Sequence, residues 1–82
     1  MDEIVYKGMT EEEISKSATC SYYYARDVLR GRYKLGEKEI SMSAMYSYDY
    51  ARDVLKGRFE LGEKAIFDSG DDKLAIMYLE LY

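Results

Sequence analysis

A segment of this 82-residue chain occurs twice, 26 residues apart. Residues 22–40 read YYYARDVLRGRYKLGEKEI, and residues 48–66 read YDYARDVLKGRFELGEKAI. Fourteen of these 19 positions are identical, and the E-x-x-I element that closes each copy also occurs earlier, at Glu11 and Ile14. Periods of about 20–50 residues are typical of proteins built from stacked supersecondary units. The repeat therefore predicts a series of similar packed units.

Each unit is expected to contain a short helix, a bend and a longer helix. In the second copy, apolar residues at helical spacing predict the longer helix over residues 43–56, and the first copy predicts its equivalent over residues 17–30. Gly57 and Gly31 follow these segments, and glycine is the usual residue at a left-handed helix end. We expect these two glycines to end the helices. A shorter helical turn is expected over residues 63–67.

The last segment of the chain departs from the repeat, because the ARDVL-x-G-R signature is absent after Ile66. Asp71 or Ser69 is expected to cap a final helix over residues 73–82. Apolar residues cover nearly every face of this helix, so it is expected either to be buried or to associate with another copy of the chain. The residues proposed for self-association are Leu74, Tyr78, Leu79 and Tyr82.

Together these patterns predict an all-α fold. The chain is too short for a second core, so residues 1–82 are expected to form a single domain. The domain is predicted to be a small helical repeat of about two and a half 26-residue helix-turn-helix units. Their approximate bounds are 11–36, 37–62 and a degenerate 63–82.

The composition argues against most enzyme chemistry. The chain has no His, and His is the usual general base and the commonest metal ligand. The single cysteine, Cys20, cannot form a disulfide within the chain or build a thiolate metal site. We therefore expect a protein that is not an enzyme and that needs no cofactor or metal.

The charge balance argues against a generic nucleic-acid clamp. Twelve Lys and Arg stand against 16 Asp and Glu, which gives a net charge of -4. The two complete units are nearly neutral, and the acidic surplus lies mainly in residues 63–82. No signal peptide or membrane-spanning run is recognisable, so no membrane partner is expected and the predicted location is the cytoplasm.

Repeated basic and aromatic residues are the first candidates for partner binding. Stacked units would align the cations into a stripe, with tyrosines beside it that offer contact area at low entropic cost. The cations of the stripe are Arg26, Arg30, Arg32, Arg52, Lys56 and Arg58. The residues proposed to contact a partner are Arg26, Arg30, Arg52, Lys56, Tyr23, Tyr33 and Tyr46. The alternative is structural: Asp27 and Asp53 neutralise the arginines in ion pairs, with Asp49–Arg52 and Asp53–Lys56 already at i,i+3 spacing.

The acidic residues Asp71 and Asp72 are the second candidates. They could imitate phosphates and occupy a nucleic-acid-binding groove on a partner protein. The alternative is that they lie in the first turn of a helix, where negative charge favours the helix dipole.

The segment YARDVLKGRFELGEKAI resembles the Tyr-rich YA-x-DVLKGRF-x-x-GE-x-x-I tandem repeats found in proteins of tailed bacteriophages and large viruses. Where that family has a proline after the aromatic residue, this chain has Lys34 and Glu60. The resemblance implies a phage origin and supplies no catalytic motif. A small phage protein without enzyme signatures is similar in type to inhibitors of host defence, including anti-CRISPR proteins.

These observations favour a non-enzymatic protein-binding module. We expect a phage-encoded, anti-CRISPR-like inhibitor of a host defence enzyme or nucleic-acid enzyme, which acts by steric and electrostatic occlusion in the host cytoplasm. One alternative is direct nucleic-acid binding through the Arg/Tyr stripe. Another is a structural homo-oligomer formed through the C-terminal helix.

Overall fold

The computed structural model describes residues 8–81, and all the regular secondary structure in that range is helical. This confirms the all-α prediction for that part of the chain. The α-helices are α1 (Glu11–Ile14), α2 (Ala18–Tyr23), α3 (Glu37–Ile40), α4 (Ala44–Tyr50), α5 (Glu60–Asp68) and α6 (Asp72–Leu79). Two π-helical turns, η1 (Tyr24–Leu29) and η3 (Ala51–Leu55), continue α2 and α4, and a 3-10 turn, η2 (Lys34–Gly36), precedes α3.

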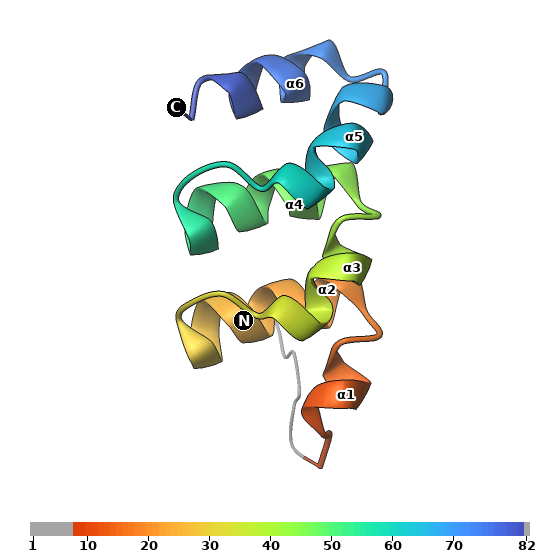
Figure 1. The fold of residues 1–82 in the computed structure, drawn as a ribbon, viewed down its shortest axis with the longest axis vertical. Helices are drawn as coiled ribbons and strands as arrows, with labels where there is room; N and C mark the ends of the chain where they lie inside the picture. The colour runs from red at the N-terminus through yellow and green to blue at the C-terminus, as the bar shows by residue number, and fades with distance from the viewer. Residues whose placement is uncertain (1–7, 82) are drawn as a thin grey trace.

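The longer helices lie in one row and the shorter ones in another. Figure 1 shows α2, α4 and α6 stacked along the long axis of the molecule, with α1, α3 and α5 along one side of that stack. The principal extents are 38 × 24 × 19 Å. Helix α4 packs against both α2 and α6, so each gap between neighbouring long helices forms a separate contact zone.

Each long helix begins at a polar side chain that caps its first turn. The hydroxyls of Ser17 and Ser43 accept the N–H groups of residues 20 and 46, both at 3.1 Å. The carboxylate of Asp71 accepts the N–H of Leu74 at 3.1 Å, which confirms Asp71 as the cap of the last helix. These caps satisfy backbone donors that would otherwise have no partner at a helix N-terminus.

The predicted glycine stops are wrong by one residue. The left-handed residues are Arg30 and Lys56, each with φ of 55°, and the glycines follow them. The reason is the π-helical turn: the carbonyl of Ala25 accepts the N–H of Arg30 and also that of Gly31, the latter at 3.1 Å. The chain therefore reverses at the cationic residue, before it reaches the glycine.

Two predicted helix boundaries also need correction. The turn expected over residues 63–67 is the nine-residue helix α5, which begins at Glu60, directly after the buried ring of Phe59. The final helix ends at Leu79 instead of continuing over residues 73–82. Tyr82 lies outside the described residues.

The core lies between the two rows of helices. The isoleucines of the three E-x-x-I elements are all buried, as are the predicted core tyrosines Tyr22, Tyr48 and Tyr50, whereas Tyr24 is half-buried. Leu74 and Tyr78 are buried in the same core, at 5% and 1% exposed. The expectation that these two side chains form a self-association surface is therefore wrong, since they already pack within the chain.

Within residues 8–81, no helix has the length and apolar character needed to cross a membrane.

Candidate functional site

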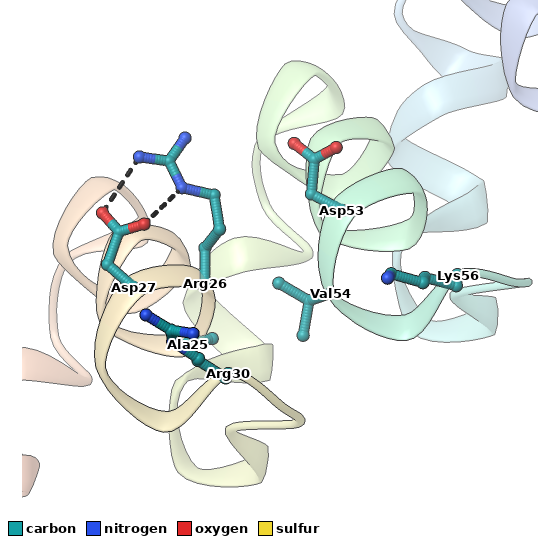
Figure 2. A pocket seen from close by; sticks show the side chains of 7 residues that line it. All are labelled: Ala25, Arg26, Asp27, Arg30, Asp53, Val54 and Lys56. Carbon is teal, nitrogen blue, oxygen red and sulfur yellow. Dashed lines mark hydrogen bonds and ion pairs between the residues drawn. The ribbon is translucent and has the colours of Figure 1, made fainter.

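A cleft separates the two π-helical turns and is lined by both copies of the ARDVL segment. Its volume is about 440 Å³. The residues that line it are Ala25, Arg26, Asp27, Arg30, Asp53, Val54 and Lys56. Figure 2 shows Val54 between the two turns, with the Arg26–Asp27 pair on one wall and Lys56 on the other. The structure thus brings three of the predicted stripe cations to one place.

The first arginine of each ARDVL segment is bound by the aspartate that follows it. Arg26 donates twice to Asp27, at 2.7 and 2.9 Å, and Arg52 donates twice to Asp53, both at 2.7 Å. Arg52 also contacts Asp49 at 3.5 Å, which confirms the ion pair expected from i,i+3 spacing. Bidentate pairing with a carboxylate leaves these two guanidinium groups largely neutralised.

The remaining repeated arginines are also paired. Arg32 donates to both carboxylate oxygens of Glu37, at 2.7 and 3.1 Å, and Arg58 makes the same pair with Glu63, at 2.9 and 3.0 Å. The structural alternative for the basic stripe therefore holds for four of its arginines.

Arg30 and Lys56 directly follow the two ARDVL segments and differ from the arginines described above. Both side chains are exposed, and neither side chain makes a hydrogen bond or ion pair within residues 8–81, so the expected Asp53–Lys56 pair is wrong. Asp53 instead binds Arg52 and accepts the hydroxyl of Tyr22. The left-handed ends of η1 and η3 leave Arg30 and Lys56 at the walls of the cleft, with their charges available to an anion.

The proposed contact tyrosines have different environments. Tyr33 is only 4% exposed, and its hydroxyl donates to the carbonyl of Glu11, so its assignment to the surface is wrong. Tyr23 and Tyr46 are half-buried, with ring centroids 6.4 Å apart, and both rings lie against Tyr22. They pack across the gap between α2 and α4, which leaves only their outer edges for a partner.

The pKa shifts in the cleft follow from these contacts. The hydrogen bonds from Arg26 lower the pKa of Asp27, and those from Arg52 lower the pKa of Asp53. Burial and the hydrogen bond to Asp53 raise the pKa of Tyr22 to about 12. Both aspartates are therefore ionised near pH 7 and serve as counter-ions, since a general base works best with a pKa near the operating pH.

The acidic candidates lie outside the cleft. Asp71 caps α6 and Asp72 is the first residue of that helix, and both are exposed. Leu79 of the same helix is 57% exposed and is the described member of the proposed association surface that remains available.

The sequence did not predict Asp49 as a site residue. Asp49 is half-buried, and it lines a second hollow between α4 and α6 with Met45 and Met77. The sequence does contain a signal for this residue. Asp49 is one of the five differences between the two repeated segments, and it aligns with Tyr23 of the first copy.

Residues 8–81 contain no group of three or more Cys, Asp or Glu placed to hold a metal ion. Comparison with protein-family models, with curated proteins and with solved structures finds no match.

Proposed function

We propose that this chain is a non-enzymatic helical-repeat module that binds an acidic surface of another protein through the cleft between η1 and η3. The observation that carries the proposal is the pair of exposed cations, Arg30 and Lys56, whose side chains make no hydrogen bond or ion pair within the described residues and line the same cleft. Val54 lines the cleft as well and supplies apolar surface between the two cations. A partner with carboxylates around a small apolar patch would complement both features.

The repeat organisation is supported by contacts that recur at matching positions. Arg32–Glu37 and Arg58–Glu63 are the same pair 26 residues apart. The left-handed residues Arg30 and Lys56 have the same spacing. In a stacked repeat each unit presents the equivalent residue at a regular step, and such series form extended binding surfaces.

A protein partner is favoured over nucleic acid by the state of the arginines. Binding to phosphates requires cations that can replace counter-ions. Four arginines of the two complete units are already bound by carboxylates within the chain, and the net charge is -4. The two remaining cations of the cleft suit a local acidic patch better than a continuous phosphate backbone.

The resemblance to phage tandem repeats suggests where the partner comes from. We propose a phage-encoded inhibitor, acting in the host cytoplasm, that covers a functional surface of a host defence enzyme or nucleic-acid enzyme. Occlusion requires affinity and bulk but no catalytic group, which agrees with the non-enzymatic proposal.

The test compares two double variants, each of which removes two positive charges. Arg30→Gln/Lys56→Gln removes the cleft cations, and Lys34→Gln/Lys38→Gln removes two exposed lysines elsewhere. Tagged wild-type protein is incubated with nuclease-treated bacterial lysate, and bound proteins are identified by mass spectrometry. We expect a specific protein that binds the wild type and the lysine control and is lost from the cleft variant.

Three results would contradict the proposal. The cleft is wrong if the cleft variant retains the same protein as the wild type. Retention of DNA or RNA at low salt, with a steep loss on adding salt, would favour nucleic-acid binding. A native dimer by light scattering that becomes monomeric in Leu79→Glu, with no captured protein, would favour the homo-oligomer.

A further inference from the structure

A second hollow lies between α4 and α6, on the next gap along the stack. Its volume is about 240 Å³. The residues that line it are Met45, Tyr48, Asp49, Arg52, Asp71, Lys73, Leu74 and Met77. It shares no lining residue with the cleft between η1 and η3, so the two surfaces can be tested separately.

The equivalent gap between α2 and α4 is filled by the chain's own tyrosines. The three long helices can be compared position by position from their N-caps, which are Ser17, Ser43 and Asp71. The sixth residue after the cap is Tyr23 in α2, and Asp49 takes its place in α4. The third residue after the cap is Tyr46 in α4, and Leu74 takes its place in α6.

The rings of Tyr23 and Tyr46 meet in the first gap, with centroids 6.4 Å apart. In the second gap both rings are replaced by smaller side chains, Asp49 and Leu74, and the hollow occupies that position. The two replacements, Asp49 for Tyr23 and Leu74 for Tyr46, therefore account for the open space.

Asp49 gives this space a specific polar group. Its side chain is 19% exposed, and the ion pair that it makes within the described residues is the 3.5 Å approach of Arg52. Arg52 directs its two short hydrogen bonds at Asp53 instead. Burial raises the pKa of Asp49, as expected for a carboxylate with incomplete pairing. A hydrogen-bond donor entering the hollow would satisfy this carboxylate.

We propose that the hollow between α4 and α6 binds a tyrosine side chain of a partner protein, with the ring between Met45 and Met77 and the hydroxyl donating to Asp49. The size fits, because a cavity of about 150 Å³ already accepts benzene. Methionine side chains adapt to inserted groups and contact aromatic rings favourably through sulfur. The inserted ring would take the place that Tyr23 and Tyr46 hold in the first gap.

The test uses the methyl groups of the methionines as NMR reporters on the full chain. The probes are p-cresol, which is the tyrosine side chain, toluene, which lacks the hydroxyl, and N-acetyl-tyrosinamide. We expect saturable shifts for Met45 and Met77 with p-cresol and N-acetyl-tyrosinamide, and none for Met9 and Met42. Toluene is expected to bind about tenfold more weakly, because it cannot donate to the carboxylate.

Two variants distinguish the effect of filling the hollow from the effect of removing the carboxylate that accepts the hydrogen bond. Asp49→Tyr restores the residue of the first copy and is expected to abolish p-cresol binding, and Asp49→Leu is expected to reduce p-cresol to the affinity of toluene. Lys38→Tyr adds an exposed ring elsewhere and is expected to bind p-cresol like the wild type. Met77→Trp fills the hollow from α6 and replaces Asp49→Tyr if that variant does not fold.

The proposal is overturned if p-cresol shifts all methionines alike, or if binding survives in the folded filled variant. Equal affinities for p-cresol and toluene would remove the role of Asp49. Binding of p-cresol without N-acetyl-tyrosinamide would show a site for free phenols and exclude a tyrosine of a polypeptide. None of these results depends on Arg30 or Lys56, so failure here is distinct from failure of the proposed function.

Discussion

The hydroxyl of Tyr50 donates to the carboxylate of Glu37 at 2.7 Å, and both side chains are buried. The same hydroxyl accepts the backbone N–H of Tyr33 at 2.9 Å, so it joins a long helix to the preceding bend. Tyr78 makes the equivalent contacts further along the chain, with Glu63 at 2.7 Å and the N–H of Phe59 at 3.0 Å. In α4 and in α6, one tyrosine thus links the helix to the bend and the short helix that precede it.

Tyr50→Phe is expected to lower the free energy of unfolding by about 1–3 kcal/mol, because it leaves the buried N–H of Tyr33 without a partner and removes one of the hydrogen bonds to buried Glu37, whose carboxylate still pairs with Arg32. Urea unfolding followed by circular dichroism measures the change. Tyr46→Phe is the matched control, since the Tyr46 hydroxyl has no hydrogen bond within the described residues, and a change within about 0.5 kcal/mol is expected there. Equal effects of the two variants would show that the Tyr50 hydroxyl stabilises nothing.

Gly62→Ala is expected to destabilise the fold by about 1–3 kcal/mol through overpacking. A Cβ at Gly62 would lie 2.3 Å from Oγ of Ser47 and 2.7 Å from the ring of Phe59, both buried. Gly57→Ala is the control, because its nearest neighbour would be the carbonyl of Leu55 at 3.9 Å. That variant is expected to be neutral or slightly stabilising. Thermal unfolding midpoints compare the two, and a neutral Gly62→Ala would mean that the long helix and the bend are less closely packed than described.

The sequence predicted the parts of this molecule that depend on local chemistry. Capping at Asp71, burial of Tyr22 and Tyr50 and the Asp49–Arg52 pair follow from side-chain type and helical spacing, and all are confirmed. The features it missed depend on how helices meet. Burial of Tyr33 follows from contact with a helix 22 residues earlier, which no periodicity within its own segment reports.

The helix ends show the same limit. A glycine after a helical stripe ordinarily marks the left-handed residue, but a π-helical turn shifts the reversal to Lys56, and such turns have no simple sequence signature. The hollow beside Asp49 could not be predicted from the sequence either, because it depends on how α6 packs against α4. The spacing between the caps Ser43 and Asp71 is two residues longer than the spacing between Ser17 and Ser43, so the 26-residue period does not give the position of α6.

Lys56→Gly is expected to stabilise the protein while it weakens the proposed partner binding. A left-handed conformation costs a non-glycine residue about 1–2 kcal/mol, and part of the gain is offset by the larger backbone entropy of glycine in the unfolded chain. The expected net gain is about 0.5–1 kcal/mol in urea unfolding. Lys38→Gly, inside α3, is the control and is expected to lose about 1 kcal/mol. A loss of stability in Lys56→Gly would show that the Lys56 side chain makes stabilising contacts.

The stability of the fold is expected to fall above pH 10 through Tyr22. Its pKa is raised to about 12 by burial and by the hydrogen bond to Asp53, so the folded chain keeps a proton that the unfolded chain loses near pH 10. The stabilisation from this group is therefore complete below pH 10 and is lost as the pH rises toward 12, at up to about 1.4 kcal/mol per pH unit. Free energies of unfolding at several pH values between 8 and 12 measure it.

The control for this pH dependence is Tyr22→Phe, which retains the ring and has no proton to lose. Other lysines and tyrosines titrate in both proteins, so the informative quantity is the stability of the wild type minus that of Tyr22→Phe. This difference is expected to be positive below pH 10 and to shrink above it, because only the wild type must then keep a phenol protonated beside the carboxylate of Asp53. A difference that stays constant from pH 8 to 12 would mean that Tyr22 ionises equally in the folded and unfolded chains, and the hydrogen bond to Asp53 would then contribute no pH-dependent stability.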